Sequence, residues 1–251
     1  PPQAATIADT SGGGKTMANQ EVTTQEVSFP GKACALKAYT AHSSGAGKHP
    51  AVIVVQEWWG LDDHIKDVAR RFAAQGYFAV APDLYSRQGY KVTKDPNVAG
   101  QLMGGLKMDD GIQDLLSTVD WIKQQSGADG AKIGVIGFCM GGSYATLLPC
   151  VSKDIKAAAP FYGEIPSNDK LKSLNCPMFF AYGENDGWIQ RKDVDRLAAA
   201  LRELNQAGEV RIYTGCQHGF FNDTRPDVHS AKDANDAWGR ALKLFDQNLK
   251  A

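Results

Sequence analysis

The sequence lacks an excess of charge of either sign. Its 27 lysines and arginines nearly balance 28 aspartates and glutamates, which gives a formal net charge of -1 over 251 residues. Proteins that bind nucleic acid through the phosphate backbone usually carry a basic surplus or a basic cluster. The composition therefore argues against nucleic acid or another polyanion as a partner.

Long apolar runs are also missing. No uninterrupted stretch approaches the roughly 20 residues that a membrane-spanning helix needs, and no basic segment followed by an apolar run opens the chain. We therefore expect no membrane partner. The chain starts at Pro1, which leaves two interpretations open: a mature periplasmic or secreted form after signal-peptide removal, or non-native residues ahead of Met17.

Paired cysteine motifs are absent. Five cysteines are scattered without CxxC spacing, so the sequence predicts neither a disulfide framework nor a zinc site. We expect reduced thiols, no metal and no cofactor, and reduced thiols favour the cytoplasm. The five residues are Cys34, Cys139, Cys150, Cys176 and Cys216.

Residues 1–20 and residues 21–251 differ in composition. The first twenty are rich in Pro, Ala, Ser, Thr and Gly and poor in large apolar side chains, which predicts a flexible tail. Residues 21–251 are expected to form a single α/β domain that opens with an antiparallel hairpin around the Pro-Gly pair at 30–31.

Strand-like and helical patterns alternate through the rest of the chain. Strands are predicted at 51–56, 77–82, 132–138, 155–163, 177–183 and 210–215. Helices are predicted at 63–76, at 108–125, from 140, at 193–206 and around 234–245. This alternation predicts a mainly parallel sheet with helices on both faces.

A glycine-rich turn at 137–142 joins a predicted strand to a predicted helix and places Cys139 at its centre. This is the context of a nucleophile elbow, in which small neighbours allow a sharp turn and the central side chain enters the cleft. A helix N-terminus favours a thiolate, and the amide of Met140 points to where an oxyanion would form. The alternative is that Cys139 is a small buried residue beside a packing site.

Two later residues favour the catalytic interpretation. Asp186 and His218 each follow a predicted strand, and the order nucleophile, acid, histidine is the one that α/β-hydrolases use. Ligands of parallel sheets bind at the carboxyl ends of strands, where all three residues lie. We predict Cys139 as nucleophile, His218 as base and Asp186 as the residue that orients the base, with Glu184 as the alternative to Asp186.

The remaining histidines and cysteines are expected to be structural. The histidines His42, His49, His64 and His229 are predicted to be solvated surface residues, and the other four cysteines to be inert packing residues. Cys216 lies two residues before His218 in the sequence, so its position relative to the site is of interest.

Several motifs taken together resemble the dienelactone hydrolase family from about Thr24 to the C-terminus. They are VIVVQEWWG, APDLYSRQG, GVIGFCMGG, AYGENDGW and GCQHGFF. The resemblance implies an eight-stranded α/β-hydrolase core, no metal, and hydrolysis of carboxymethylenebutenolide, an enol lactone, to maleylacetate. It also implies that Glu57 pairs with the resting thiol and that the amide of Trp58 is the second oxyanion donor.

The resemblance further implies an anion site, and here the sequence departs from the family. Arg87 of the DLYSR segment is expected to hold a substrate carboxylate. Two other family arginines are missing, because the first region reads NVAGQLMGGLK and Asn222 stands four residues after His218. Lys107 and Arg225 are the other candidates. Six aromatic residues are expected to wall an apolar pocket, namely Trp58, Trp59, Phe138, Tyr162, Trp188 and Phe220.

Three functions remain open from the sequence. The first is opening of a small, anionic enol lactone by a monomer through an acyl-enzyme. The second keeps the Cys139 triad and changes the substrate to a broader range of esters or thioesters. The third is a catalytically silent fold that only binds a ligand.

Overall fold

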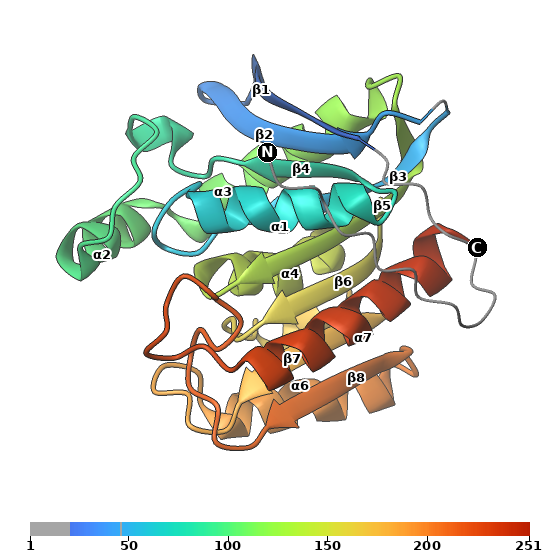
Figure 1. Cartoon of the computed structure of the whole chain (residues 1–251). Helices are drawn as coiled ribbons and strands as arrows, with labels where there is room; N and C mark the ends of the chain where they lie inside the picture. The colour runs from blue at the N-terminus through green and yellow to red at the C-terminus, as the bar shows by residue number, and fades with distance from the viewer. Residues whose placement is uncertain (1–20, 46) are drawn as a thin grey trace, which may run out of the picture.

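The structure is a computed structural model that describes residues 21–45 and 47–251. The predicted tail at 1–20 lies outside the described residues. Eight strands form one sheet in the order β1-β2-β4-β3-β5-β6-β7-β8 (Figure 1). Their bounds are β1 (Val22–Pro30), β2 (Ala35–Ser43), β3 (His49–Val55), β4 (Phe78–Pro82), β5 (Ala128–Phe138), β6 (Ile155–Phe161), β7 (Met178–Gly183) and β8 (Gly208–Tyr213).

The sheet is parallel from β4 to β8, and only its first edge contains antiparallel pairs. β2 pairs antiparallel with β1 on one side and with β4 on the other, and the remaining neighbours pair parallel. The central strands have continuous apolar runs because both of their faces are covered, and residues 51–55 of β3 are fully buried. The predicted opening hairpin and mainly parallel sheet are confirmed.

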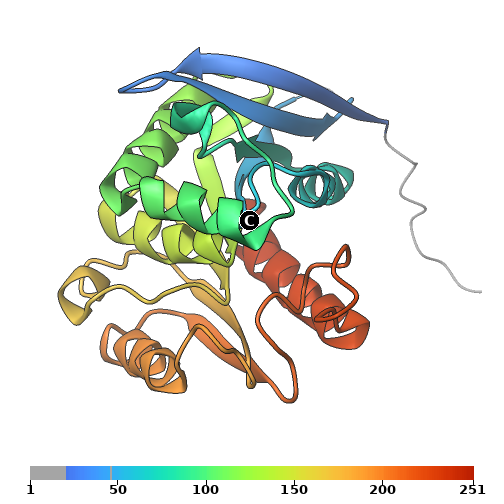
Figure 2. The same ribbon diagram turned by 90° about the vertical axis from the view of Figure 1, so that its left-hand side faces the viewer.

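Helices cover both faces of the sheet, as predicted. Figure 2 views the sheet close to its edge, with one helical layer on each side. α1 (Asp63–Ala74) and α7 (Ala231–Leu249) form one layer (Figure 1). α3 (Met108–Lys123), α4 (Met140–Val151) and α6 (Arg191–Glu203) form the other. None of the helices in the described part of the chain is long and apolar enough to cross a membrane.

The central helix α4 is buried on every side. All its residues from Met140 to Cys150 are buried, because it packs on β3, β5 and β6 while α3 and α5 (Asn168–Leu171) cover its outer side. A helix that is apolar all round fits such a position. This rigid packing fixes the turn at its N-terminus.

Three short elements were not predicted. They are the 3₁₀ helix η1 (Ser86–Gln88), α2 (Pro96–Gly105) and α5 (Asn168–Leu171). Three glycines weaken the helical pattern of α2. The start of α2 nevertheless has a readable signal, since Asp95 caps it by accepting a hydrogen bond from the amide of Asn97 and Pro96 follows at the first helical position.

Candidate active site

The turn between β5 and α4 holds Cys139 in a strained conformation. Its backbone has φ 56° and ψ -121°, a left-handed φ that an L-residue adopts only where the surroundings impose it. A Cβ on Gly137 would lie 2.0 Å from the carbonyl oxygen of Gly141, and a Cβ on Gly141 would lie 2.3 Å from that of Val55. The glycines therefore permit the close approach of strand and helix that forms the turn.

Asp186 follows β7 and is held by backbone amides. Its Oδ1 atom accepts hydrogen bonds of 2.8 Å from the amides of Trp188 and Ile189. Its Oδ2 atom lies 2.8 Å from Nδ1 of His218, and the carboxylate has no exposed area. These contacts fix the orientation of the carboxylate and leave one oxygen for the imidazole. Glu184, the alternative, accepts instead from the amide of Gly215.

His218 lies between this carboxylate and Cys139. Burial opposes the charged imidazolium, but the hydrogen bond to Asp186 and the interaction with Cys139 outweigh it and raise the pKa of His218 to about 10. Nε2, the nitrogen that does not face Asp186, is buried and has no hydrogen-bond partner in the described part of the chain. The raised pKa of His218 favours its protonated imidazolium form.

Two aromatic rings pack against the imidazole of His218. The ring centroid of Tyr162 lies 4.9 Å from that of His218, and the ring centroid of Trp188 lies 5.3 Å away, both edge to face. Tyr162 itself has φ 40° and is fully buried. Phe220 is also fully buried and packs on Tyr162 and Tyr213, so it belongs to the supporting core of the site.

Glu57 is a buried carboxyl just beyond β3. It accepts a 2.8 Å hydrogen bond from Nδ2 of Asn222 and a longer one, 3.4 Å, from the hydroxyl of Tyr162. Burial raises its pKa, against the opposing effects of His64 and of Asn222. No hydrogen bond joins it to the thiol of Cys139 among the described residues. The structure thus brings Glu57 to the site but pairs it with Asn222 and Tyr162.

The two expected oxyanion donors, the amides of Met140 and Trp58, belong to segments that Tyr85 links. As the first residue of α4, Met140 has no acceptor for its amide within the helix. The hydroxyl of Tyr85 donates to the carbonyl of Trp58 at 2.9 Å and lies 3.5 Å from Sδ of Met140. Tyr85 was not singled out from the sequence, although it lies in the APDLYSRQG motif. It links the segments that carry both amides.

The side chain of Arg87 has a different partner from the one expected. Its Nε and Nη2 atoms donate to the two carboxylate oxygens of Asp114 at 2.9 and 2.7 Å. The Asp114 side chain is only 1% exposed, and a carboxylate that is so buried requires a cation. The expectation that the guanidinium of Arg87 is free to bind a substrate carboxylate is therefore wrong, because it pairs with Asp114 of the same chain.

The other candidate cations are Lys107 and Arg225. Lys107 precedes α3. Arg225 lines a cavity of about 520 Å³ together with Trp59, His64 and Asn222. Its guanidinium lies 5.6 Å from the ring centre of Trp59, and Nη2 is 2.9 Å from a carboxylate oxygen of Asp227.

The expectation that His64 is solvated is wrong. Its side chain has no exposed area, and its ring packs against Phe138 and Phe221. The signal was present in the sequence, since His64, Val68 and Phe72 recur at helical spacing on the buried face of α1. Nδ1 lies 3.3 Å from a carboxylate oxygen of Asp223.

The cysteines other than Cys139 are free thiols in unreactive surroundings. Burial raises the pKa of Cys150 and Cys216 to about 11 and that of Cys176 to about 12. Cys216 points to Asp233, with Sγ 3.2 Å from a carboxylate oxygen. Within residues 21–45 and 47–251, no three His, Cys, Asp or Glu side chains gather as ligands of a metal ion would.

Comparisons with known proteins identify the family of the chain. The sequence model of the Dienelactone hydrolase family matches residues 36–249. A Yersinia pestis protein named "Putative carboxymethylenebutenolidase" is 35% identical over 238 residues, which cover 89% of this chain and 88% of that protein.

Two solved structures have the same fold. A Klebsiella pneumoniae structure described as a "Putative Dienelactone Hydrolase" has a TM-score of 0.84 at 32% identity and covers 90% of this chain and 99% of that one. The "Dienelactone Hydrolase-like Promiscuous Phospotriesterase P91" from metagenomic libraries has a TM-score of 0.84 at 21% identity, covering 90% of this chain and 98% of that one, a likeness of fold alone. With the family model matched over most of its length, the chain belongs to the dienelactone hydrolase family.

Proposed function

We propose that the protein is a carboxylic-ester hydrolase that opens enol lactones of the carboxymethylenebutenolide kind through a cysteine acyl-enzyme. Its family and its relatives support a hydrolase of the dienelactone hydrolase type. The single observation that carries the mechanism is the placement of His218. Asp186 orients its imidazole, which faces Cys139 at the strained turn.

In the first step, Sγ of Cys139 attacks the carbonyl carbon and a tetrahedral oxyanion forms. The amides of Met140 and Trp58 stabilise this oxyanion by hydrogen bonds. The carbon–oxygen bond of the ester or lactone then breaks, and His218 gives its Nε2 proton to the leaving oxygen. The product of this step is a thioester on Cys139, with a neutral His218.

In the second step, water hydrolyses the thioester. Neutral His218 takes a proton from the water, and the resulting hydroxide attacks the thioester carbonyl. Collapse of the second tetrahedral intermediate breaks the carbon–sulfur bond and restores the thiolate facing the imidazolium. Asp186 stays ionised and keeps Nδ1 of His218 protonated throughout.

A second candidate function differs from the first in the range of substrates. Arg87 is paired with Asp114, and the neutral Asn222 stands beside Glu57. These two contacts favour the second candidate, a broader ester hydrolase with the same reacting groups. Arg225 lines the same cavity as Asn222, together with Lys66 and Lys94, and is the cation that we propose to hold a substrate carboxylate.

Steady-state hydrolysis of dienelactone and of p-nitrophenyl acetate tests the proposal. We expect Cys139→Ala to lower kcat on both substrates by at least about a thousandfold, while Cys150→Ala, which changes a buried thiol of α4, retains activity. Loss of dienelactone turnover alone in Arg225→Ala supports the lactone assignment. Equal rates in Cys139→Ala and the wild type would refute the thiol mechanism, and a wild type active only on the acetate would leave the broader esterase.

A further inference from the structure

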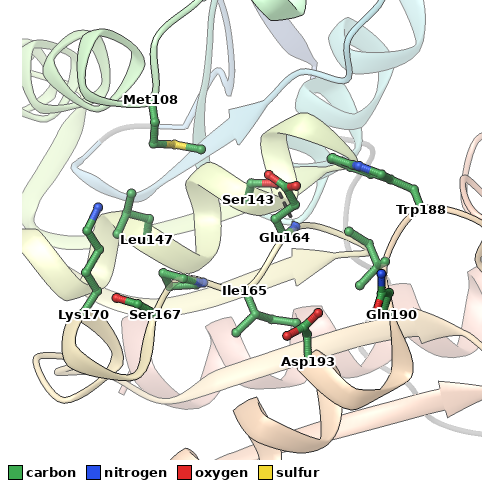
Figure 3. Close-up of a pocket in the computed structure, with 12 residues that line it drawn as sticks. Met108, Ser143, Leu147, Glu164, Ile165, Ser167, Lys170, Trp188, Gln190 and Asp193 are labelled. Carbon is green, nitrogen blue, oxygen red and sulfur yellow. Dashed lines mark hydrogen bonds between the residues drawn. The ribbon is translucent and has the colours of Figure 1, made fainter.

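A second cavity, of about 480 Å³, is lined in part by Trp188 (Figure 3), whose indole packs against His218. Its walls come from the start of α3, one face of α4, the loop after β6 with the short helix α5, and the segment after β7 with the first turn of α6. The volume lies in the range of sites that enclose a small organic ligand. None of the proposed catalytic steps uses this cavity.

One face of α4, the helix that begins directly after Cys139, forms part of the cavity wall. Ser143 and Leu147, which line the cavity, are four residues apart and therefore lie on the same face of the helix. The Ser143 hydroxyl accepts a 2.8 Å hydrogen bond from the amide of Glu164, which ties the loop after β6 to this face.

Trp188 connects the cavity to the imidazole. Its indole lines the cavity and also packs edge-on against His218, at 5.3 Å between ring centroids. Its amide donates to Asp186. Trp188 therefore borders both the imidazole of the proposed catalytic base and the cavity.

The chemistry of the walls favours an uncharged apolar group. The apolar lining consists of Met108, Leu147, Ile165, Pro166, Trp188 and Ile189. The charged lining residues are two carboxylates, Glu164 and Asp193, and one ammonium, Lys170. With two carboxylates against one ammonium, the lining offers a substrate carboxylate only Lys170 as a partner, and its net charge disfavours burying a further carboxylate.

We propose that this cavity binds the uncharged, apolar substituent of an ester, an alkyl or aryl group, while Cys139 attacks the carbonyl. The inference rests on the proposed function, because it specifies the substrates of the same site. It favours esters of medium length over a compact anionic lactone. The substituent can belong to the acyl side or to the alcohol side of the ester, since both extend from the same carbonyl group.

Two isomeric esters separate these sides. Ethyl hexanoate carries its long chain on the acyl side and hexyl acetate carries it on the alcohol side, with ethyl acetate as the short reference. Each buried methylene is expected to raise kcat/KM about fourfold, which corresponds to about 0.8 kcal/mol. At least one isomer should therefore be hydrolysed by the wild type far more efficiently than ethyl acetate, and which one it is identifies the side.

Ile165→Trp fills the cavity. Ile165 is half-buried, and its loop is held by hydrogen bonds from Arg196 to the carbonyls of Ile165 and Pro166, which the substitution leaves in place. We expect Ile165→Trp to lower the ratio of kcat/KM for the preferred long ester over ethyl acetate by about tenfold or more. The matched control is Val151→Trp, because Val151 is 51% exposed at the far end of α4 and does not line the cavity.

Calorimetric binding of the same esters to Cys139→Ala separates failure of this inference from failure of the proposed function. Length-dependent binding that Ile165→Trp abolishes supports the cavity even if the wild type hydrolyses no ester. Cys139-dependent hydrolysis with the same length ratio in the wild type, Ile165→Trp and Val151→Trp would overturn the cavity assignment and leave the thiol mechanism standing.

Discussion

At the scale of single residues, the site depends on a few side chains held in costly states. Cys139 has a left-handed backbone, Glu57 is a buried carboxyl, and His218 is a largely buried imidazole with a raised pKa. Each state is paid for by specific contacts, above all those of Asp186 with two backbone amides and with His218.

The charge state of His218 is directly measurable. We expect its ring protons, followed by NMR, to titrate near pH 10, and Asp186→Asn to move that titration to lower pH. Because the folded-state pKa lies above the ordinary value of 6.5, the stability that this ring contributes is fully present below pH 6.5 and is lost as the pH rises towards 10. A wild-type titration near 6.5 would rule out the imidazolium–thiolate pair.

The sequence pointed to the residues that we propose as reacting groups but not to the partners that hold them. Cys139, Asp186 and His218 could be predicted because each follows a strand and carries its own local pattern. The pairing of Glu57 with Asn222 joins residues 165 positions apart, and no local pattern encodes it. The burial of His64 was readable from its spacing with Val68 and Phe72, and the polarity of histidine obscured it.

At the scale of elements, the turn from β5 into α4 is set by backbone contact. A Cβ on Gly141 would lie 2.3 Å from the carbonyl oxygen of Val55 and 2.5 Å from that of Gln56. We therefore expect Gly141→Ala to reduce the free energy of unfolding, measured with urea, by about 3 kcal/mol.

The control for this substitution is Gly100→Ala in α2. An added Cβ at Gly100 meets nothing within 4 Å, so the change should raise stability by about 0.5–1 kcal/mol through helix propensity. Equal effects of the two substitutions would show that the close packing of the elbow is unimportant.

The ion pair between Arg87 and Asp114 links η1 to α3. Arg87→Met strands a carboxylate that is 1% exposed, so we expect a loss of about 3–5 kcal/mol in the free energy of unfolding. The double variant Arg87→Met/Asp114→Leu should recover most of that loss. Normal stability of Arg87→Met together with a raised KM for dienelactone would restore Arg87 as a substrate-binding residue.

At the scale of the whole molecule, the sheet brings the site together from distant parts of the chain. Glu57 follows β3, Cys139 follows β5, Asp186 follows β7 and His218 follows β8, and all four strands are parallel. The alternation of strands and helices was enough to predict this common edge. Which cavity at that edge receives which part of a substrate depends on side-chain packing between segments, and the sequence pattern does not contain it.

The acyl-enzyme is the central claim, and intact-protein mass spectrometry tests it most directly. The protein is mixed with p-nitrophenyl acetate and quenched with acid during turnover. We predict a mass increase of one acetyl group, located on the peptide that contains Cys139, and no such adduct in Cys139→Ala. Rapid Cys139-dependent turnover without any adduct, or an acetyl group on another residue that persists in Cys139→Ala, would contradict the mechanism.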